Sequence, residues 1–242
     1  MKILLISDIH SNVQALEAVL QAESDADAIY CAGDLVDYGP YPKEVLDLVR
    51  ERNIPCVSGN HDERVVEFAK DREAIAKLPR EKRHWVHQNV EALGTDDIAF
   101  LAGLPVSLEF TADGHAYHMR HRGAEGYELI QLLPEFDAHW SGGRSPDLES
   151  GQTARVIVGH THIQAVHYLR GDRLWLNPGS VSYRPTRQDM DLSRDAEYMT
   201  IVDGQISFHR HAFDRRKTFL FTESLALSNS ETRVGYRIFG MG

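Results

Sequence analysis

Apolar and polar residues alternate in blocks along the first sixty residues of the chain. Short apolar runs at 3–7, 28–32 and 54–58 predict β-strands. Between them, apolar residues at helical spacing predict amphipathic helices over 12–23 and 43–52. This strand–helix–strand order is typical of a parallel sheet with right-handed crossovers and helices on both faces.

The pattern then changes from helical to strand-like. Helical periodicity predicts helices over 63–77, 81–93 and 95–101, with another near 125–133. Turn signals such as Asp203-Gly204 predict hairpins between the later apolar runs. These later strands are expected at 106–110, 116–120, 154–158, 164–169, 173–176, 198–202 and 205–211. We therefore expect an α/β fold in which a two-sheet β-sandwich is flanked by helices.

The same pattern predicts a single domain over residues 1–212. The segment 213–242 is polar and weakly patterned. We expect it to be a C-terminal extension, and its pattern does not distinguish a small folded extension from an interface arm or a partly disordered segment.

Composition narrows the class of protein. The net charge is −10, from 26 Lys+Arg against 36 Asp+Glu, and an acidic surface disfavours non-specific nucleic-acid binding because it repels phosphates. No apolar run reaches the length of a membrane span, and the MKILLISD start is strand-like rather than a signal peptide. We expect a cytoplasmic protein in which Cys31 and Cys56, both in apolar runs, are buried free thiols.

Four of the predicted strands are each followed by a cluster of potential metal ligands. Asp8 and His10 follow the first strand, Asp34 the second, 59–62 (Gly-Asn-His-Asp) the third, and 159–162 (Gly-His-Thr-His) a later one. Residues i and i+2 of a strand point the same way, so each Asp-x-His or His-x-His pair is expected to aim at one place. Carboxylate, amide and imidazole donors together suit Mn, Fe, Zn, Co or Ni rather than Ca or Mg alone. Four such clusters in series predict a site for two metal ions.

These clusters give the chain a resemblance to a known family, the calcineurin-like metallophosphoesterases, and most closely to their small bacterial and archaeal members. The resemblance spans about residues 1 to 185 and is carried by Asp8-x-His10-x-Asn12, GDLVDYGP at 33–40, GNHD at 59–62, GHTH at 159–162 and NPGSV at 177–181. It implies a four-layer αββα fold. It also implies a phosphoesterase that hydrolyses a small phosphate ester by direct attack of a metal-bridging hydroxide, without a covalent intermediate.

The resemblance further implies a ligand set. One ion would be held by Asp8, His10 and His162, and the second by Asn60, His160 and one more histidine, with Asp34 bridging the two. Two divalent transition-metal ions are implied, with Mn the first choice and Fe, Zn, Ni or Co as alternatives.

The remaining histidine of the second ion is either His118 or His121. A glycine at position 123 gives His121 the better downstream context, whereas His118 keeps a more typical distance to Tyr127. Side chains three apart on a strand point to opposite faces, so only one of the two can reach the ion. We favour His121 if the strand ends near Arg120.

His61, next to Asn60, is implied as the general acid, which either protonates the leaving oxygen or orients the phosphate. A carboxylate commonly holds the other ring nitrogen of such an imidazole, and both Asp37 and Asp62 are candidates. Asp62 could equally cap the helix that begins there.

Three further residues are candidates for substrate contact. Asn12 matches an active-site asparagine of the family but could simply cap the first helix. Arg122 and Arg184 are phosphate-binding candidates because the guanidinium fork fits phosphate oxygens.

A second class of function is a binding or scaffold protein that uses the same fold with a degenerate site. That alternative predicts missing ligands, and nearly all ligands are present, so we favour the enzyme and expect a small phosphorylated substrate. The sequence leaves open whether the substrate is a phosphomonoester, a phosphodiester, a cyclic nucleotide or a dinucleoside polyphosphate, and whether the chain forms a homo-oligomer.

Overall fold

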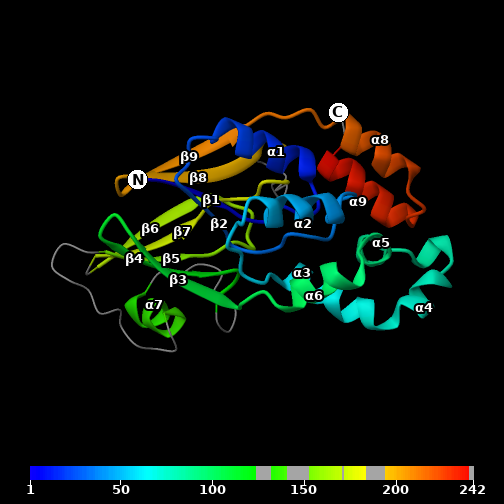
Figure 1. Ribbon diagram of the computed structural model, residues 1–242, viewed down its shortest axis with the longest axis horizontal. Coiled ribbons are helices and arrows are strands. Elements are labelled where there is room, and N and C mark those ends of the chain that lie inside the picture. The colour runs from blue at the N-terminus through cyan, green and yellow to red at the C-terminus, as the bar shows by residue number, and fades with distance from the viewer. Residues whose placement is uncertain (124–131, 141–152, 171, 184–193, 240–242) are drawn as a thin grey trace.

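Two β-sheets stacked face to face form the centre of the molecule, and helices lie outside them (Figure 1). The structure is a computed structural model that describes residues 1–123, 132–140, 153–170, 172–183 and 194–239. Its strands lie within two residues of the predicted ones, except at 54–58, where only an isolated bridge joins Cys56 to Cys31. The two-sheet sandwich predicted from the sequence is confirmed.

The first sheet has the strand order β2-β1-β8-β9. β1 (Lys2–Ile6) pairs in parallel with β2 (Ala28–Cys31) and antiparallel with β8 (Ala196–Val202), which pairs with β9 (Gln205–His211). The β8–β9 hairpin turns at Asp203 (φ 49°) and Gly204 (φ 82°), the two left-handed residues that a type I′ turn requires. This sheet is therefore mixed rather than wholly parallel.

The second sheet has the strand order β3-β4-β5-β7-β6. Its strands are β3 (Ser107–Ala112), β4 (His115–Arg120), β5 (Ala154–Ile157), β6 (Ala165–Leu169) and β7 (Arg173–Asn177). β4, β5 and β7 run parallel, so their carboxyl ends lie at the same edge of the sheet.

The alternation of apolar side chains along β1 creates two cores. Ile3 and Leu5 point between the sheets, where they join Met119 and Ile157. Leu4 and Ile6 point outward into a second core that includes residues of α1 (Val13–Ala22) and α2 (Pro42–Glu51). Because β1 is buried on both faces, it reads in the sequence as a continuous apolar run.

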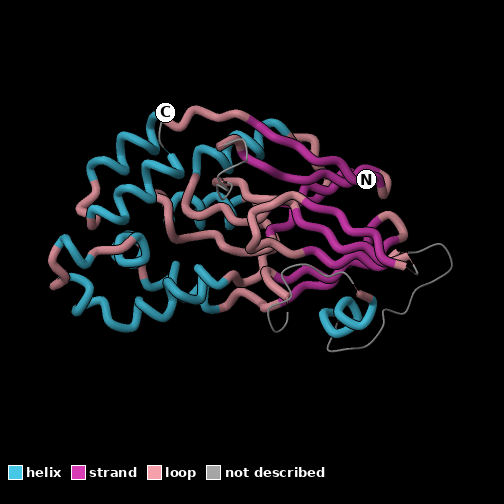
Figure 2. The backbone as a smooth tube through the Cα atoms, turned by 180° about the vertical axis from the view of Figure 1, so that it is seen from behind, coloured by secondary structure: helices cyan, strands magenta, loops and turns pink. Residues whose placement is uncertain are grey.

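Most of the remaining helices gather at one end of the sandwich (Figure 2). They are α3 (Asn60–Phe68), η1 (Ala69–Asp71), α4 (Arg72–Ala76), η2 (Arg80–Lys82), α5 (Trp85–Ala92) and α6 (Thr95–Ala102). The predicted helices 63–77 and 81–93 are thus each broken into shorter pieces. α7 (Leu133–His139) covers the outer face of the second sheet through Phe136 and completes the fourth layer. The predicted helix near 125–133 falls almost entirely outside the described residues.

The tail after residue 213 forms two helices, α8 (Arg216–Ser224) and α9 (Asn229–Phe239). Their buried residues include Thr218, Thr222 and Gly235. A search for apolar residues at helical spacing does not count these three, so the sequence pattern of this segment is weak. α9 is joined to α5 because Trp85 donates its backbone N–H to the Glu231 carboxylate and its indole N–H to the Glu231 carbonyl, both at 3.1 Å.

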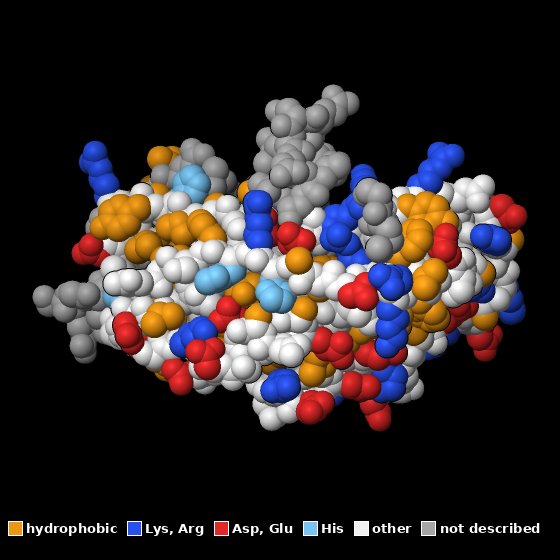
Figure 3. Space-filling view, turned by 90° about the horizontal axis from the view of Figure 1, so that it is seen from above, with side chains coloured by type: hydrophobic (Ala, Val, Ile, Leu, Met, Phe, Trp, Pro, Cys, Tyr) orange, Lys and Arg blue, Asp and Glu red, His pale blue; other side chains and the backbone are white. Residues whose placement is uncertain are grey.

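Within the described part of the chain, no helix has the length and apolar character needed to cross a membrane. Acidic and basic side chains are interspersed over the face seen from above in Figure 3.

Gly235 offers a test of how the C-terminal helices dock. A Cβ at this position would lie 2.7 Å from Thr222 Cγ2 and 2.9 Å from Trp85 Cζ2. Gly235→Ala should therefore lower the free energy of unfolding by about 1–3 kcal/mol through overpacking, although alanine raises intrinsic helix propensity. Urea denaturation measures the change, with Arg233→Ala on the exposed side of α9 as control. A Gly235→Ala variant more stable than the parent would contradict the packing described.

Candidate metal centre

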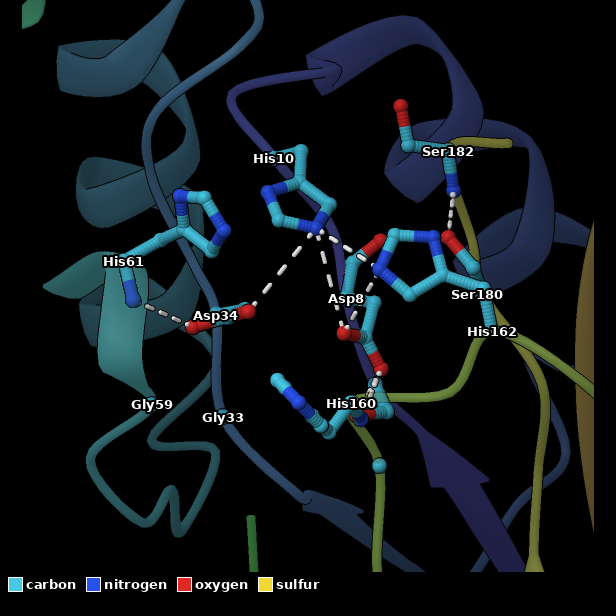
Figure 4. Close-up of polar contacts among 12 residues, drawn as sticks. Asp8, His10, Gly33, Asp34, Gly59, His61, His160, His162, Ser180 and Ser182 are labelled. Atoms are coloured by element: carbon cyan, nitrogen blue, oxygen red, sulfur yellow. Dashed lines mark hydrogen bonds and ion pairs between the residues drawn. The ribbon is translucent and has the colours of Figure 1, made fainter. Parts of the chain in front are cut away.

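Asp8, His10 and His162 converge at the carboxyl end of β1, and their side chains point toward one another in Figure 4. His162 Nε2 lies 3.0 Å from Asp8 Oδ1 and 3.1 Å from His10 Nε2. The other oxygen, Asp8 Oδ2, accepts hydrogen bonds from Ser7 Oγ (2.6 Å) and from the His160 backbone N–H (3.1 Å). Asp8 Oδ1 is buried without a hydrogen-bond partner, so one oxygen is anchored and the other faces two imidazole nitrogens.

Asp34, His121 and His160 form an adjacent group with the same construction. Asp34 Oδ1 accepts the His61 backbone N–H at 2.8 Å, while Oδ2 is buried without a hydrogen-bond partner. This bare oxygen lies 3.1 Å from His121 Nε2 and 3.9 Å from His10 Nε2. His121 Nε2 is also 3.1 Å from the amide oxygen of Asn60. Asp34 is thus the carboxylate that lies between the two groups.

Backbone carbonyls fix the orientation of two of these imidazoles. His121 Nδ1 lies 2.8 Å from the Ala32 carbonyl, and His162 Nδ1 lies 3.0 Å from the Tyr183 carbonyl. A carbonyl can only accept, so each Nδ1 carries the proton and each Nε2 is left with its lone pair in the neutral ring. Such carbonyl contacts to the second ring nitrogen are typical of metal-binding histidines.

The charge balance of the centre calls for cations. Burial disfavours the charged form of His121, but the Asp34 carboxylate outweighs it and raises the pKa of His121 to about 10. Burial likewise opposes ionisation of Asp34, yet the adjacent His121 holds the pKa of Asp34 well below its usual range. Burial lowers the pKa of His10 to about 3, which keeps that ring neutral. A divalent cation would replace the proton that His121 otherwise carries, so two buried carboxylates with bare oxygens beside imidazole nitrogens fit divalent transition metals.

The ligand pairs do not converge through strand alternation, as the sequence pattern had suggested. β1 ends at Ile6 and β5 at Ile157, so both pairs lie in loops beyond the strand ends. Asp8, His10, Asp34, His160 and His162 all have positive φ, between 48° and 67°. Left-handed conformations of this kind are uncommon for residues other than glycine and cluster at functional sites.

Two glycines let the backbone come close to these carboxylates. A Cβ on Gly59 would lie 2.1 Å from Asp34 Oδ1, and a Cβ on Gly159 would lie 2.8 Å from Asp8 Oδ2. A larger residue would clash with Asp34 at position 59 and with Ser7 and Asp8 at position 159. These clashes give a packing reason for the glycine that opens each of the motifs 59–62 and 159–162.

Asp62 has a different position from the one proposed as a partner of His61. Its buried carboxylate accepts four backbone N–H groups, from Gly59, Asp34, Leu35 and Val36, at 2.9–3.1 Å. It therefore caps α3, as the helix-capping alternative predicted, and also fixes the loop that carries Asp34.

His61 is held by Asp37 instead. His61 Nδ1 lies 2.8 Å from Asp37 Oδ2, and Arg64 Nη1 lies 3.3 Å from the same oxygen. Burial opposes protonation of His61, but the hydrogen bond to Asp37 and the charge of Asp34 together raise the pKa of its imidazole. The Tyr38 ring lies 4.6 Å from the His61 ring, centroid to centroid.

His118 lies away from this centre, and the structure places only His121 beside Asp34 and Asn60. His118 Nδ1 is 3.1 Å from Glu109 Oε1, and its ring packs 5.6 Å from Trp140. β4 ends at Arg120, so His121 is the first residue beyond the strand, and its carbonyl accepts the Gly159 N–H at 2.9 Å.

The candidate substrate residues have mixed positions. Asn12 caps α1 by accepting the Ala15 N–H and also donates to Ser182 Oγ, both at 3.3 Å. Arg122 is exposed and lines a small cavity of about 140 Å³ that Asn60 and His121 also line. Arg184 lies outside the described residues.

Sequence reasoning missed Asn89, whose buried amide connects α5 to the loops of the site. Its oxygen accepts from Ser11 Oγ (2.6 Å) and the Asp37 N–H (2.9 Å), and its nitrogen donates to the Gly39 and Trp85 carbonyls. A polar residue on the otherwise apolar face of α5, four residues after Trp85, is the signal that could have indicated it.

Comparisons with known proteins identify the family of the chain. Residues 1–203 match the family model of the calcineurin-like phosphoesterase superfamily domain. An uncharacterized protein of Methanocaldococcus jannaschii is 30% identical over 262 residues, which covers 98% of this chain and 97% of that protein.

Two solved structures share the fold. A metallophosphoesterase from Sphaerobacter thermophilus superposes with a TM-score of 0.68 at 24% identity, covering 98% of both chains. A hypothetical protein from Pyrococcus horikoshii OT3 superposes with a TM-score of 0.76 at 16% identity, covering 99% of this chain and 98% of that one. The chain therefore belongs to the calcineurin-like phosphoesterase superfamily.

Proposed function

We propose that the protein is a metal-dependent hydrolase that uses a dinuclear centre to cleave a small phosphate ester. Asp8, His10 and His162 would hold one ion, and Asn60, His121 and His160 the other. The observation that carries the proposal is the position of Asp34, whose bare oxygen faces His121 at 3.1 Å and His10 at 3.9 Å. One carboxylate is thus shared between two ligand groups.

The donor set favours a transition metal, with Mn the first choice and Fe, Zn, Ni or Co as alternatives. Bound there, two divalent cations would supply a nucleophilic water at neutral pH and neutralise charge on the phosphoryl oxygens. The chain contributes the rest: backbone carbonyls orient His121 and His162, burial keeps bulk water from the two carboxylates, and both ligand groups are fixed on loops that hydrogen bonds hold in place.

His61 would act as the general acid toward the leaving oxygen. Asp37 occupies its Nδ1, which leaves Nε2 to carry a proton toward the substrate. The raised pKa of His61 keeps a larger fraction of the ring protonated near neutrality, as a general acid requires.

A small substrate fits both the surroundings and the charge of the protein. The cavity of about 140 Å³ beside Asn60 and His121 includes Arg122, whose guanidinium suits phosphate oxygens. The net charge of −10 disfavours a polyanionic polymer. The described residues supply all the proposed ligands, which favours the enzyme over a scaffold with a degenerate site.

A further proposal concerns the location of the protein. The buried cysteines Cys31 and Cys56 are free thiols, as is usual in a reducing compartment, and we propose a cytoplasmic location.

A hydrolysis panel on Mn-loaded protein, comparing p-nitrophenyl phosphate, bis-p-nitrophenyl phosphate and cyclic nucleotides, tests the activity and its ester preference.

The first site variant tests the shared carboxylate. The purified protein reconstituted with Mn should hold two metal equivalents, and Asp34→Asn should abolish turnover while the fold stays intact, because the amide keeps the hydrogen bond to His61 but loses the charge. Elemental analysis, circular dichroism and the hydrolysis panel measure these, with exposed Asp96→Asn as control. One equivalent or none in the parent protein would contradict the proposal.

A second variant separates proton transfer from metal binding. His61→Ala should lower kcat by roughly 10²–10⁴, the usual contribution of a positioned general acid, while both metal equivalents remain. His167→Ala on β6 serves as the control. If His61→Ala loses metal, His61 is a ligand rather than the acid.

A matched pair of variants tests the choice between His118 and His121. His121→Ala should lose one metal equivalent because His121 Nε2 faces Asp34. His118→Ala should retain both equivalents, since His118 contacts Glu109 and Trp140 instead. Metal titration followed by elemental analysis measures both, and the reverse result would make His118 the ligand.

A further inference from the structure

A cavity of about 720 Å³ lies between α3, α4 and α5, and nothing in the proposed reaction has used it. We call it the α3–α5 cavity. Phe68, Ile75 and Leu78 supply its apolar lining, and Arg64, Lys82 and His87 lie among its polar lining residues. Its size falls within the range of small-molecule sites, about 300–1,000 Å³.

The α3–α5 cavity and the candidate site share one face of α3. His61, Arg64 and Phe68 stand at positions i, i+3 and i+7 of that helix, which places them on the same side. Arg64 Nη1 lies 3.3 Å from the Asp37 oxygen that also holds His61. Arg64 therefore contacts the site at one end and lines the cavity at the other.

Three planar side-chain groups, the Arg64 guanidinium and the rings of Phe68 and His87, lie next to one another along the cavity. The Arg64 guanidinium lies 5.7 Å from the centre of the Phe68 ring, and the Phe68 ring lies 5.3 Å from the His87 ring. Phe68 keeps 38% of its surface exposed, so part of the side chain is available to a ligand. Planar guanidinium and aromatic faces are the groups on which another aromatic ring stacks.

We propose that the α3–α5 cavity binds the organic part of the phosphoester and that this part is an uncharged aromatic ring system. The proposal rests on the phosphoesterase function proposed above and names its substrate class. The charged lining residues are of both signs, Arg64 and Lys82 against Glu67, Asp71 and Glu81. This mixture offers no dedicated site for a second phosphate, whereas the apolar lining is best covered by a neutral ring.

Two variants on the cavity and one matched control test the proposal. Phe68→Ala removes the exposed ring, and Ala74→Trp fills the cavity from α4. Ala76→Trp places the same side chain on the same helix, at an exposed position that is not among the lining residues described. None of the three is a proposed metal ligand or the proposed acid, and a melting curve for each checks the fold.

The substrates are 2-naphthyl phosphate and glycerol 3-phosphate, each compared between variant and parent so that their different intrinsic reactivities cancel. Phe68→Ala and Ala74→Trp should raise KM for 2-naphthyl phosphate about fivefold to tenfold, the size expected for one lost aromatic face. The kinetics of glycerol 3-phosphate should not change, and Ala76→Trp should change neither substrate. Equal effects on both substrates, or none, would overturn the proposal.

Failure of the phosphoesterase function would be seen separately, as absence of turnover of either ester by the Mn-loaded parent. In that case, calorimetry of 2-naphthyl phosphate binding to the Mn-loaded protein tests whether the cavity binds an aromatic ring. Weaker binding to Ala74→Trp than to Ala76→Trp would support the α3–α5 cavity as an aromatic site, and equal binding would overturn it.

Discussion

The burial of two carboxylates, Asp8 and Asp34, is the constraint on which the candidate site depends. Each has one oxygen satisfied by the protein and one bare oxygen that faces imidazole nitrogens. An isolated buried carboxylate is strongly disfavoured unless positive charge compensates it. The histidines, their carbonyl contacts and the shared position of Asp34 are all consistent with compensation by divalent cations.

Such an arrangement requires a rigid frame, because five proposed ligands have left-handed backbones that cost about 1–3 kcal/mol each when strained. Two buried side chains supply much of that frame. Asp62 accepts four N–H groups from the loop around Asp34 and from the start of α3. Asn89 joins Asp37 and Gly39 to α5. The helices at this end of the sandwich thus hold the loops as well as cover the core.

Helix α3 links the parts of the proposed mechanism. Its first residue, Asn60, lies beside His121, its second, His61, would donate the proton, and Arg64 and Phe68 lead to the α3–α5 cavity. The backbone N–H of His61, in the first turn of α3, also donates a hydrogen bond to Asp34. A single short helix would therefore carry residues for metal binding, proton transfer and recognition of the organic group.

The sequence by itself determined nearly all the strands, the order of the ligand clusters and the chemistry of their donors, because these depend on residues close together in the chain. β1 and β5 lie where their apolar runs predicted, with Asp8 and His160 just beyond them. Contacts between distant segments were decided only by the tertiary structure. His121 lies beside Asp34, 87 positions earlier in the chain, because β4 ends at Arg120. Likewise, the Asp62 carboxylate binds backbone N–H groups rather than His61, and Thr218 and Gly235 are buried in helices. Local periodicity did not predict these contacts because it carries no information about which surfaces pack together.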